Sequence, residues 1–315
     1  MVKIGIPRAL CYYKYFPLWN HFFSCLGLEV VESPSTNKIL FDKGAKYVVD
    51  EACLPVKVYF GHVNNLKDKV DYIFAPRIVS TEKRKYTCPK FMGIPDMLLS
   101  IDNLPQIIGP TIDLTKNEKN IYQIVWDIGR KFHNNPLKVF NAWQNAVREL
   151  NKYNGEWMSG NIPKELKINH VPEEEGQLNI AVLGHEYILY DKHLSMNLLQ
   201  KLAELKISVF TTEMVVPKNK EAEVKKLPKK IFWDFGSDAV GAAFHYSRNK
   251  KISGLINISS FGCGPDSMTN SMITHFLKKN CSKPFLNLII DEHTGEAGIN
   301  TRIEAFYDLL KRRVG

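Results

Sequence analysis

Residues 178–184 read LNIAVLG, an unbroken apolar run that ends at a glycine. Such a run predicts a strand that is buried on both faces, as in a parallel sheet. Similar runs are KIGIP (3–7), DYIFAPRIV (71–79), GLINIS (254–259) and PFLNLIID (284–291), and segments with helical spacing stand between them. This alternation predicts an α/β protein with two doubly wound parallel-sheet (Rossmann-like) domains joined by a helical segment.

The middle of the chain differs from both ends. Residues 117–153 hold no strand-like run and show apolar residues at helical spacing, and residues 154–177 have the composition of a linker. We therefore predict an N-terminal α/β domain over 1–112, a helical insertion and linker over 113–176, and a C-terminal α/β domain over 177–315. Ligands of such domains bind beyond the carboxyl ends of the strands.

Composition excludes several classes of protein. Hydrophobic residues make up 44% and charged residues 24% of the 315, which is typical of a globular protein and not of a disordered chain. No apolar stretch approaches the roughly 18 residues of a membrane span, and MVKIGIPRAL (1–10) lacks the parts of a signal peptide. We therefore expect a cytoplasmic protein with no membrane segment.

The formal net charge is +9, but the basic residues stand in short scattered clusters without interleaved aromatic residues. This pattern does not favour nucleic-acid binding. Solubility, or docking to an acidic protein or a phosphorylated ligand, explains the charge equally well.

Six cysteines in a chain of this size do not indicate a disulfide framework. Three of them share a local pattern, because Cys53, Cys88 and Cys263 each precede a proline by one or two residues, in loops that lead into helices. The positive end of a helix stabilises a thiolate, and several such ends could hold an anionic iron–sulfur cluster. The alternative is that each cysteine is a small buried side chain.

The other three cysteines carry weaker signals. Cys11 follows the first strand and could be a fourth ligand or a neighbour of the site, whereas Cys25 and Cys281 have the setting of structural residues. Two strands end in Pro-Arg, which places Arg8 and Arg77 at the expected ligand-binding edge. These arginines could offset the charge of a cluster, contact the phosphate of an acyl carrier, or form structural ion pairs.

DEHTGEAG (291–298) follows a buried strand with an unusual density of polar groups. Glu292, His293 and Glu296 could act as an acid, a base or supporting hydrogen-bond donors. They could instead cap the last helix and pair with Arg302. His185, at the end of the strand 178–184, is more typical of a loop histidine than of a ligand.

Six segments carry a family resemblance. They are KIGIPRAL (3–10), DEACLPVK (50–57), DYIFAPRIVS (71–80), CPKFMGIPD (88–96), SFGCGPDS (260–267) and DEHTGEAGINTRIEAF (291–306). In this order they resemble the D-component-like proteins of the 2-hydroxyacyl-CoA dehydratase superfamily, which include CoA-substrate-specific activase-related proteins and double-cubane cluster proteins. The resemblance extends over 1–110 and 176–315 and is weaker in the helical middle.

The resemblance implies an oxygen-sensitive iron–sulfur cluster, a [4Fe-4S] cubane or a double cubane, at the junction of the two α/β domains. Its ligands would be Cys53, Cys88 and Cys263, with Cys11 as a possible fourth. It also implies a partner, a separate ATP-hydrolysing activase dimer that carries its own cluster and supplies electrons. Arg8 and Arg77 would offset cluster charge.

The resemblance predicts a low-potential redox protein that passes single electrons to a substrate or partner, with Glu292 and His293 handling protons. Acyl-CoA or another small molecule would be the acceptor, and the chain would form a homodimer or pair with another subunit. One alternative is a 2-hydroxyacyl-CoA dehydratase (lyase) subunit. Another is a non-catalytic cluster carrier or scaffold that docks to the activase.

Overall fold

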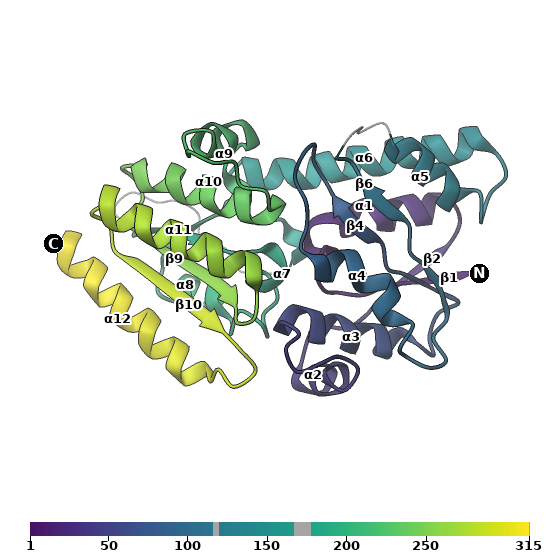
Figure 1. Cartoon of the computed structure of the whole chain (residues 1–315), viewed down its shortest axis with the longest axis horizontal. Coiled ribbons are helices and arrows are strands. Elements are labelled where there is room, and N and C mark those ends of the chain that lie inside the picture. Colours follow the sequence, from purple (N-terminus) through teal and green to yellow (C-terminus); the bar gives the residue numbers. More distant parts are fainter. Residues whose placement is uncertain (116–119, 167–177, 315) are drawn as a thin grey trace. The chain divides into compact units, whose positions relative to one another are not determined.

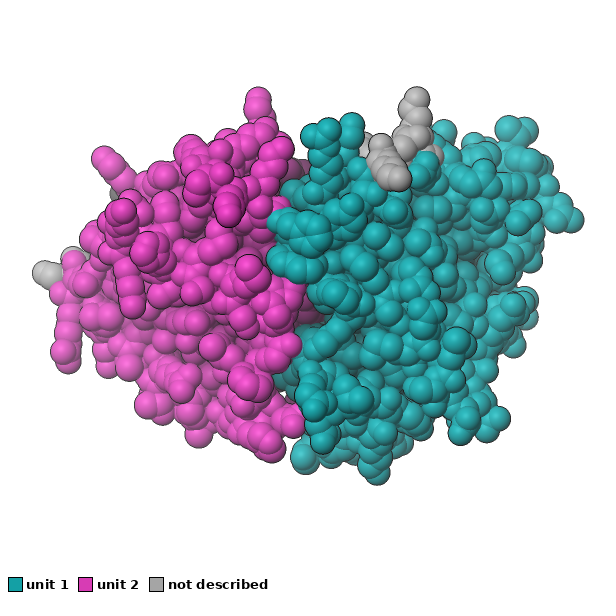
Figure 2. Space-filling model, viewed as in Figure 1, with its two compact units in different colours: residues 1–153, 232–234 teal, residues 154–231, 235–315 magenta. Residues whose placement is uncertain are grey.

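The computed structural model describes residues 1–115, 120–166 and 178–314. The chain divides into two compact units (Figure 2): unit 1 comprises 1–153 with 232–234, and unit 2 comprises 154–231 with 235–315. The predicted domain limits at 112/113 and 176/177 stay a prediction, and the acidic part of the expected linker, 173–175, lies outside the described residues.

Unit 1 alternates strands and helices (Figure 1). Its elements are β1 (Lys3–Ile6), α1 (Tyr12–Cys25), β2 (Glu29–Glu32), α2 (Lys38–Ala45), α3 (Leu54–Leu66), β3 (Tyr72–Phe74), β4 (Arg77–Ser80), α4 (Pro89–Leu98), β5 (Gln106–Ile108), β6 (Thr111–Asp113), α5 (Asn120–Gly129) and α6 (Pro136–Met158), the last of which continues into unit 2. Four strands form a parallel sheet in the order β2-β1-β3-β5, and β4 pairs with β6 in a separate parallel pair.

The segment 71–79, which we expected to form one strand, is two strands in different sheets. β3 ends at Phe74 and β4 begins at Arg77, with Pro76 between them. Proline has no N–H to donate to a ladder, so pairing with the same neighbour cannot continue through it. The break leaves Arg77 at the start of β4.

The helices α5 and α6 pack into the core of unit 1. Val125 and Ile128 of α5, with Val139 and Trp143 of α6, belong to the same buried cluster as Ile4 of β1. The rings of Trp19 and Trp143 lie 5.8 Å apart between their centroids. The apolar residues at helical spacing in this region therefore lie on the faces of the two helices that pack against the sheet.

Unit 2 repeats the α/β plan. Its elements are η1 (Lys164–Leu166), β7 (Asn179–Leu183), α7 (Glu186–Leu189), α8 (Leu198–Glu204), β8 (Ser208–Thr211), η2 (Thr212–Met214), α9 (Pro217–Val224), α10 (Asp234–Arg248, whose first residue belongs to unit 1), β9 (Gly254–Ser260), α11 (Gly264–Asn280), β10 (Phe285–Ile290) and α12 (Glu296–Val314). The strands are parallel in the order β10-β9-β7-β8. All residues of the two central strands are buried, as the apolar run at 178–184 predicts.

A glycine ends the central strand β7. Gly184 has φ +152°, and a Cβ there would lie 2.7 Å from both the carbonyl oxygen and Cγ2 of Ile258 in the neighbouring strand β9. Only glycine allows the two strands to approach so closely before the chain turns. This turn leads directly to His185.

Parallel sheets flanked by helices confirm the predicted α/β class with two Rossmann-like parts. Among the described helices, none has both the length and the apolar character needed to cross a membrane.

Candidate functional site

Four of the six cysteines occupy the same kind of position, the residue immediately before the first turn of a helix. Cys11 precedes α1, Cys53 precedes α3, Cys88 precedes α4 and Cys263 precedes α11. The first three belong to unit 1 and Cys263 belongs to unit 2. Each of these residues is partly exposed.

Three of these cysteines also share a backbone conformation. Cys53, Cys88 and Cys263 are extended, with φ between −84° and −65° and ψ between 106° and 157°, and each is followed by proline in the first turn. None of the three side chains accepts a cap hydrogen bond. Because cysteine is not among the preferred capping residues, capping does not explain why it recurs here.

Cys11 differs from these three. Its ψ is 0°, and no proline occupies the first two positions of α1. Whether Cys11 is a ligand or a neighbour of the site stays a prediction.

The remaining two cysteines lie at the opposite ends of helices. Cys25 is the last residue of α1, and Cys281 follows the last residue of α11, where its Sγ lies 3.7 Å from the carbonyl oxygen of Ser247. The negative end of a helix disfavours a thiolate. These positions agree with the structural role expected for both residues.

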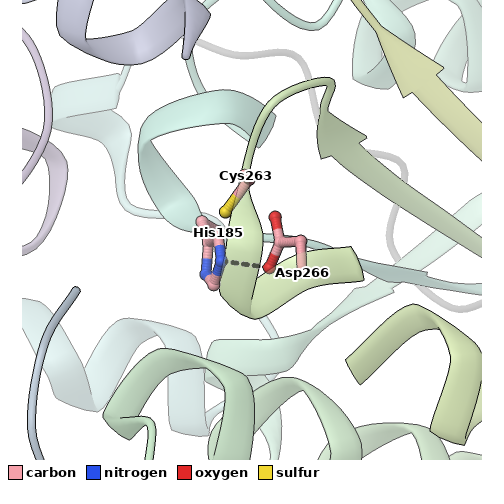
Figure 3. A group of neighbouring side chains, drawn as sticks. All are labelled: His185, Cys263 and Asp266. Carbon is pink, nitrogen blue, oxygen red and sulfur yellow. Dashed lines mark hydrogen bonds and ion pairs between the residues drawn. The ribbon is translucent and has the colours of Figure 1, made fainter. Parts of the chain in front are cut away.

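In unit 2, Cys263 lies beside a buried polar pair (Figure 3). His185 Nε2 lies 2.6 Å from Asp266 Oδ1, and the two side chains are only 5% and 7% exposed. One ligand atom from each of Cys263, His185 and Asp266 falls within 4.8 Å of the others. His185 follows β7 and Cys263 follows β9, so adjacent parallel strands bring them to one edge of the sheet.

The imidazole of His185 is held in its charged form. Burial acts to lower its pKa, but the neighbouring carboxylate of Asp266 and the sulfur of Cys263 together raise the pKa well above 6.5. Tyr187 stacks on the ring at 5.0 Å and Phe235 meets it edge-on at 5.6 Å. The charge therefore lies among aromatic rings next to the sulfur.

The second oxygen of Asp266 adds to this site. Asp266 Oδ2 is buried and accepts no hydrogen bond from the residues that the structure describes. A buried carboxylate oxygen without a donor is costly, which is typical of a site with a functional constraint.

Arg8 follows β1 by two residues. Its guanidinium lies over the ring of Tyr12 at 5.5 Å, and its buried Nε donates to none of the described residues. Burial acts to lower its pKa, but Tyr12, Tyr13 and Glu32 raise it overall, so the group stays charged. Its predicted role in offsetting cluster charge stays a prediction.

Arg77 forms the ion pair that was one of its possible roles. Its Nη2 lies 2.7 Å from Asp96 Oδ1, and its Nη1 donates to the carbonyl oxygen of Met92 at 2.6 Å. Both partners belong to α4, the helix that begins after Cys88. A contact of Arg77 with a cluster or a phosphate stays a prediction.

Residues 291–295 form a tight turn, and residues 296–298 are the first residues of α12. Asp291 Oδ1 accepts from the backbone N–H of His293 at 3.0 Å and from the hydroxyl of Thr294 at 2.7 Å, and these bonds lower the pKa of Asp291. The side chain of His293 is 86% exposed, and Glu296 pairs with Lys201 at 2.9 Å. A proton-handling role for Glu292 and His293 stays a prediction.

This turn lies at the edge of the sheet that carries Cys263. The backbone N–H of Phe261 donates to the carbonyl oxygen of Ile290 at 2.8 Å, so the loops after β9 and β10 start side by side. Within unit 2 the structure brings Cys263 together with His185 and Asp266. That Cys263 binds the same cluster as Cys53 and Cys88 stays a prediction.

His185 and Asp266 were not identified as site residues from the sequence. A histidine after a buried strand was a weak signal, and its partner lies 81 positions further along the chain. The usable clue was topological, because strands that run parallel place their following loops at one edge.

The fold and the site define a parallel α/β protein with cysteines at the positive ends of helices. The model of one known family matches residues 3–215, and its description is "CoA enzyme activase uncharacterised domain (DUF2229)". Since the match covers more than half of the 315 residues, the chain belongs to this family. A search of curated proteins finds no significant match. Membership confirms the CoA-activase-related part of the expected resemblance.

Proposed function

We propose that this chain is an iron–sulfur redox protein of the 2-hydroxyacyl-CoA dehydratase type, related to the D-components. In this role it accepts low-potential electrons from an ATP-hydrolysing activase and passes single electrons to an acceptor. The observation that carries the proposal is the shared setting of Cys53, Cys88 and Cys263, each extended before a proline-containing first turn.

The donor set fits an anionic cluster. Thiolates are the usual protein ligands of iron–sulfur clusters, and three partly exposed thiols are available here. Each lies at the positive end of a helix of ten or more residues, where negative charge is stabilised. Cys53, Cys88 and Cys263 would hold the cluster, which supplies one-electron chemistry when bound.

The residues around Cys263 would tune such a centre. The charged ring of His185 lies beside the sulfur and would stabilise its negative charge, while Asp266 fixes the orientation of that ring. Hydrogen bonds and charges next to a ligating sulfur are known means of adjusting a reduction potential. The charged ring of His185 would thus make the thiolate of Cys263 a weaker electron donor to the bound iron.

The first experiment is iron and sulfide analysis of the full chain, purified and reconstituted without oxygen, together with its visible spectrum. We expect bound iron and sulfide with broad charge-transfer absorption. Each of C53S, C88S and C263S should retain much less iron than the wild type. A colourless protein that cannot be loaded would contradict the proposal.

Matched controls come from the other cysteines. C25S and C281S remove thiols at the negative ends of helices and should retain iron as the wild type does. If C281S lost as much iron as C263S, position along the helix would not matter and the argument would fail. The variant C11S separates its two interpretations: retention of iron makes Cys11 a neighbour, and loss makes it a ligand.

The activase supplies the test of the partner. A purified CoA-enzyme activase with ATP should reduce the loaded chain, and ADP should not support this reduction. Turnover of a 2-hydroxyacyl-CoA by the reduced chain would favour the lyase alternative. Salt-sensitive binding to the activase without any electron transfer would favour the carrier or scaffold.

A further inference from the structure

Unit 1 contains an apolar cavity of about 210 Å³ at the carboxyl end of its sheet. It is lined by Ile6 of β1, Phe74 of β3, Trp19 of α1 and Trp143 of α6, among others. No arginine, lysine, histidine, aspartate or glutamate is among the described residues that line it. The location is the usual place for a ligand in a parallel α/β unit.

One polar group in this cavity lacks a partner. Tyr59 on α3 is only 5% exposed, and its hydroxyl makes no hydrogen bond with any residue in the described ranges. It is close enough to the sulfur of Cys11 to interact with it electrostatically, and Cys11 also lines the cavity. Tyr59 and Cys11 thus both line the cavity, and they lie close to each other.

The other tyrosines of the cavity are engaged. Tyr12 donates its hydroxyl hydrogen bond to Glu32, and Tyr15 shares a hydrogen bond with Thr81. Burial, followed by the effect of Cys11, raises the pKa of Tyr59 far above its ordinary value, so its hydroxyl keeps its proton at neutral pH. Tyr59 is thus a hydrogen-bond donor for which the described residues supply no acceptor.

The three helices of unit 1 that follow a cysteine all contribute residues to this cavity. Tyr59 lies on α3, which begins after Cys53, and Phe91 and Ile94 lie on α4, which begins after Cys88. The third helix, α1, begins after Cys11, which lines the cavity itself. Within unit 1, the cavity lies beside the helices that present the proposed ligands.

We propose that this cavity binds a small uncharged molecule with an apolar body and one hydrogen-bond acceptor, such as a carbonyl oxygen, which takes the hydrogen bond from Tyr59. The proposal deepens the proposed function and rests on it where it makes this molecule the electron acceptor. Binding itself does not depend on a cluster.

Size and charge limit the class of ligand. An apolar protein cavity of about 150 Å³ is large enough for benzene, so about 210 Å³ accommodates a body of about six to ten non-hydrogen atoms. None of the described lining residues is charged, so an ion in the cavity would contact no oppositely charged lining side chain and would lose much of its hydration. A single acceptor on an otherwise apolar molecule would accept the hydrogen bond of the Tyr59 hydroxyl. The ligand would then have no polar group left without a partner.

The experiment measures binding of cyclohexanone to the full anaerobic chain by titration calorimetry, with and without prior iron reconstitution. We expect saturable binding in both preparations. Y59F should weaken it by about 2- to 12-fold, the range expected for loss of one hydrogen bond. Cyclohexanecarboxylate, which has the same ring and a negative charge, should show no measurable binding.

Y153F is the matched control. Tyr153 is also 5% exposed and lies in unit 1, but its hydroxyl donates to the carbonyl oxygen of Tyr13 at 2.7 Å, and it does not line the cavity. Y153F should melt at a lower temperature and bind cyclohexanone as the wild type does. Y59F should melt at the wild-type temperature or above, because its hydroxyl has no bond to lose.

Failure of this inference differs from failure of the proposed function. No binding of cyclohexanone to the wild type, or equal binding by Y59F, overturns the cavity assignment even if iron is retained. Tighter binding of the carboxylate than of the ketone overturns it as well. A chain that binds the ketone but never retains iron keeps the cavity site and loses the redox assignment.

Discussion

Two buried histidines, one in each unit, are held in opposite charge states. In unit 1, His62 is fully buried, with Ser33 Oγ 2.8 Å from Nδ1 and Thr36 Oγ1 3.0 Å from Nε2. In unit 2, His185 is 5% exposed and faces the carboxylate of Asp266. Similar burial therefore gives opposite results, and the neighbouring group decides which form is present.

The physical cause is the balance between desolvation and charge. Burial, followed by the positive charge of Arg8, lowers the pKa of His62 to about 3. At His185 burial also acts to lower the pKa, but Asp266 and Cys263 raise the pKa by more than burial lowers it. Hydroxyls hold a neutral ring in place, whereas a carboxylate keeps its partner charged. A charged ring beside a thiol suits a site that stabilises negative sulfur.

The largest effect that tests this contrast is acid destabilisation through His62. Its pKa is about 3 in the folded protein and about 6.5 in the unfolded chain, so the unfolded chain binds more protons between these values. The free energy of unfolding should fall by about 1.4 kcal/mol for each pH unit below 6.5, or roughly 5 kcal/mol by pH 3. Urea unfolding at a series of pH values measures it.

The slope should be smaller in H62Q, which has no imidazole to protonate. H293Q removes an imidazole that is 86% exposed and should leave the slope as in the wild type. An unchanged slope in H62Q would show that other groups cause the acid loss.

The next effect concerns the charged histidine. D266N keeps the volume of Asp266 but removes the charge that His185 faces, and breaking a buried pair typically costs about 3–5 kcal/mol. We expect the lower end at pH 7, since the imidazole can then lose its proton. Urea unfolding measures the loss, and a variant as stable as the wild type would mean that His185 is not held charged.

A smaller effect is expected at the hydroxyls around His62. S33A removes the oxygen that lies against Nδ1 and that accepts from the backbone N–H of Arg8 at 2.8 Å. Leaving buried polar groups unpaired should cost about 1–3 kcal/mol. S159A removes an exposed hydroxyl and should have no measurable effect on unfolding. If S33A were as stable as S159A, the hydrogen bonds of Ser33 would make no measurable contribution to stability.

The smallest effect is expected at the exposed ion pair of Arg77 and Asp96. The side chain of Asp96 is 65% exposed, so water and salt screen the interaction. D96N should leave the melting temperature within experimental error of the wild type. A clear loss of stability, with iron retained, would assign Arg77 to holding α4 in place. A loss of iron without a loss of stability would instead support its predicted role beside the cluster.

Much of the fold follows from local patterns. The apolar run at 178–184 predicts β7, and the one at 254–259 predicts β9, because strands covered on both faces need side chains that tolerate burial throughout. The helical spacing in 117–153 predicts two helices, although part of this region lies outside the described residues. The break at Pro76 was missed, since the apolar pattern continues across it even though pairing does not.

The site was predictable only in part. Proline after Cys53, Cys88 and Cys263 marks the start of a helix, so their positions follow from the sequence. The charge of His185 depends on a carboxylate 81 residues away, which no local pattern contains. The lack of a described hydrogen-bond acceptor for the hydroxyl of Tyr59 is also invisible in the sequence, because it depends on which side chains surround it in the fold.

Iron anomalous scattering from crystals of the full chain, grown and cooled without oxygen, tests the central claim most directly. The account predicts iron peaks within bonding distance of the sulfurs of Cys53, Cys88 and Cys263, and none at Cys25 or Cys281. Crystals of reconstituted protein without iron at these three sulfurs, or with iron bound by other residues, would contradict it.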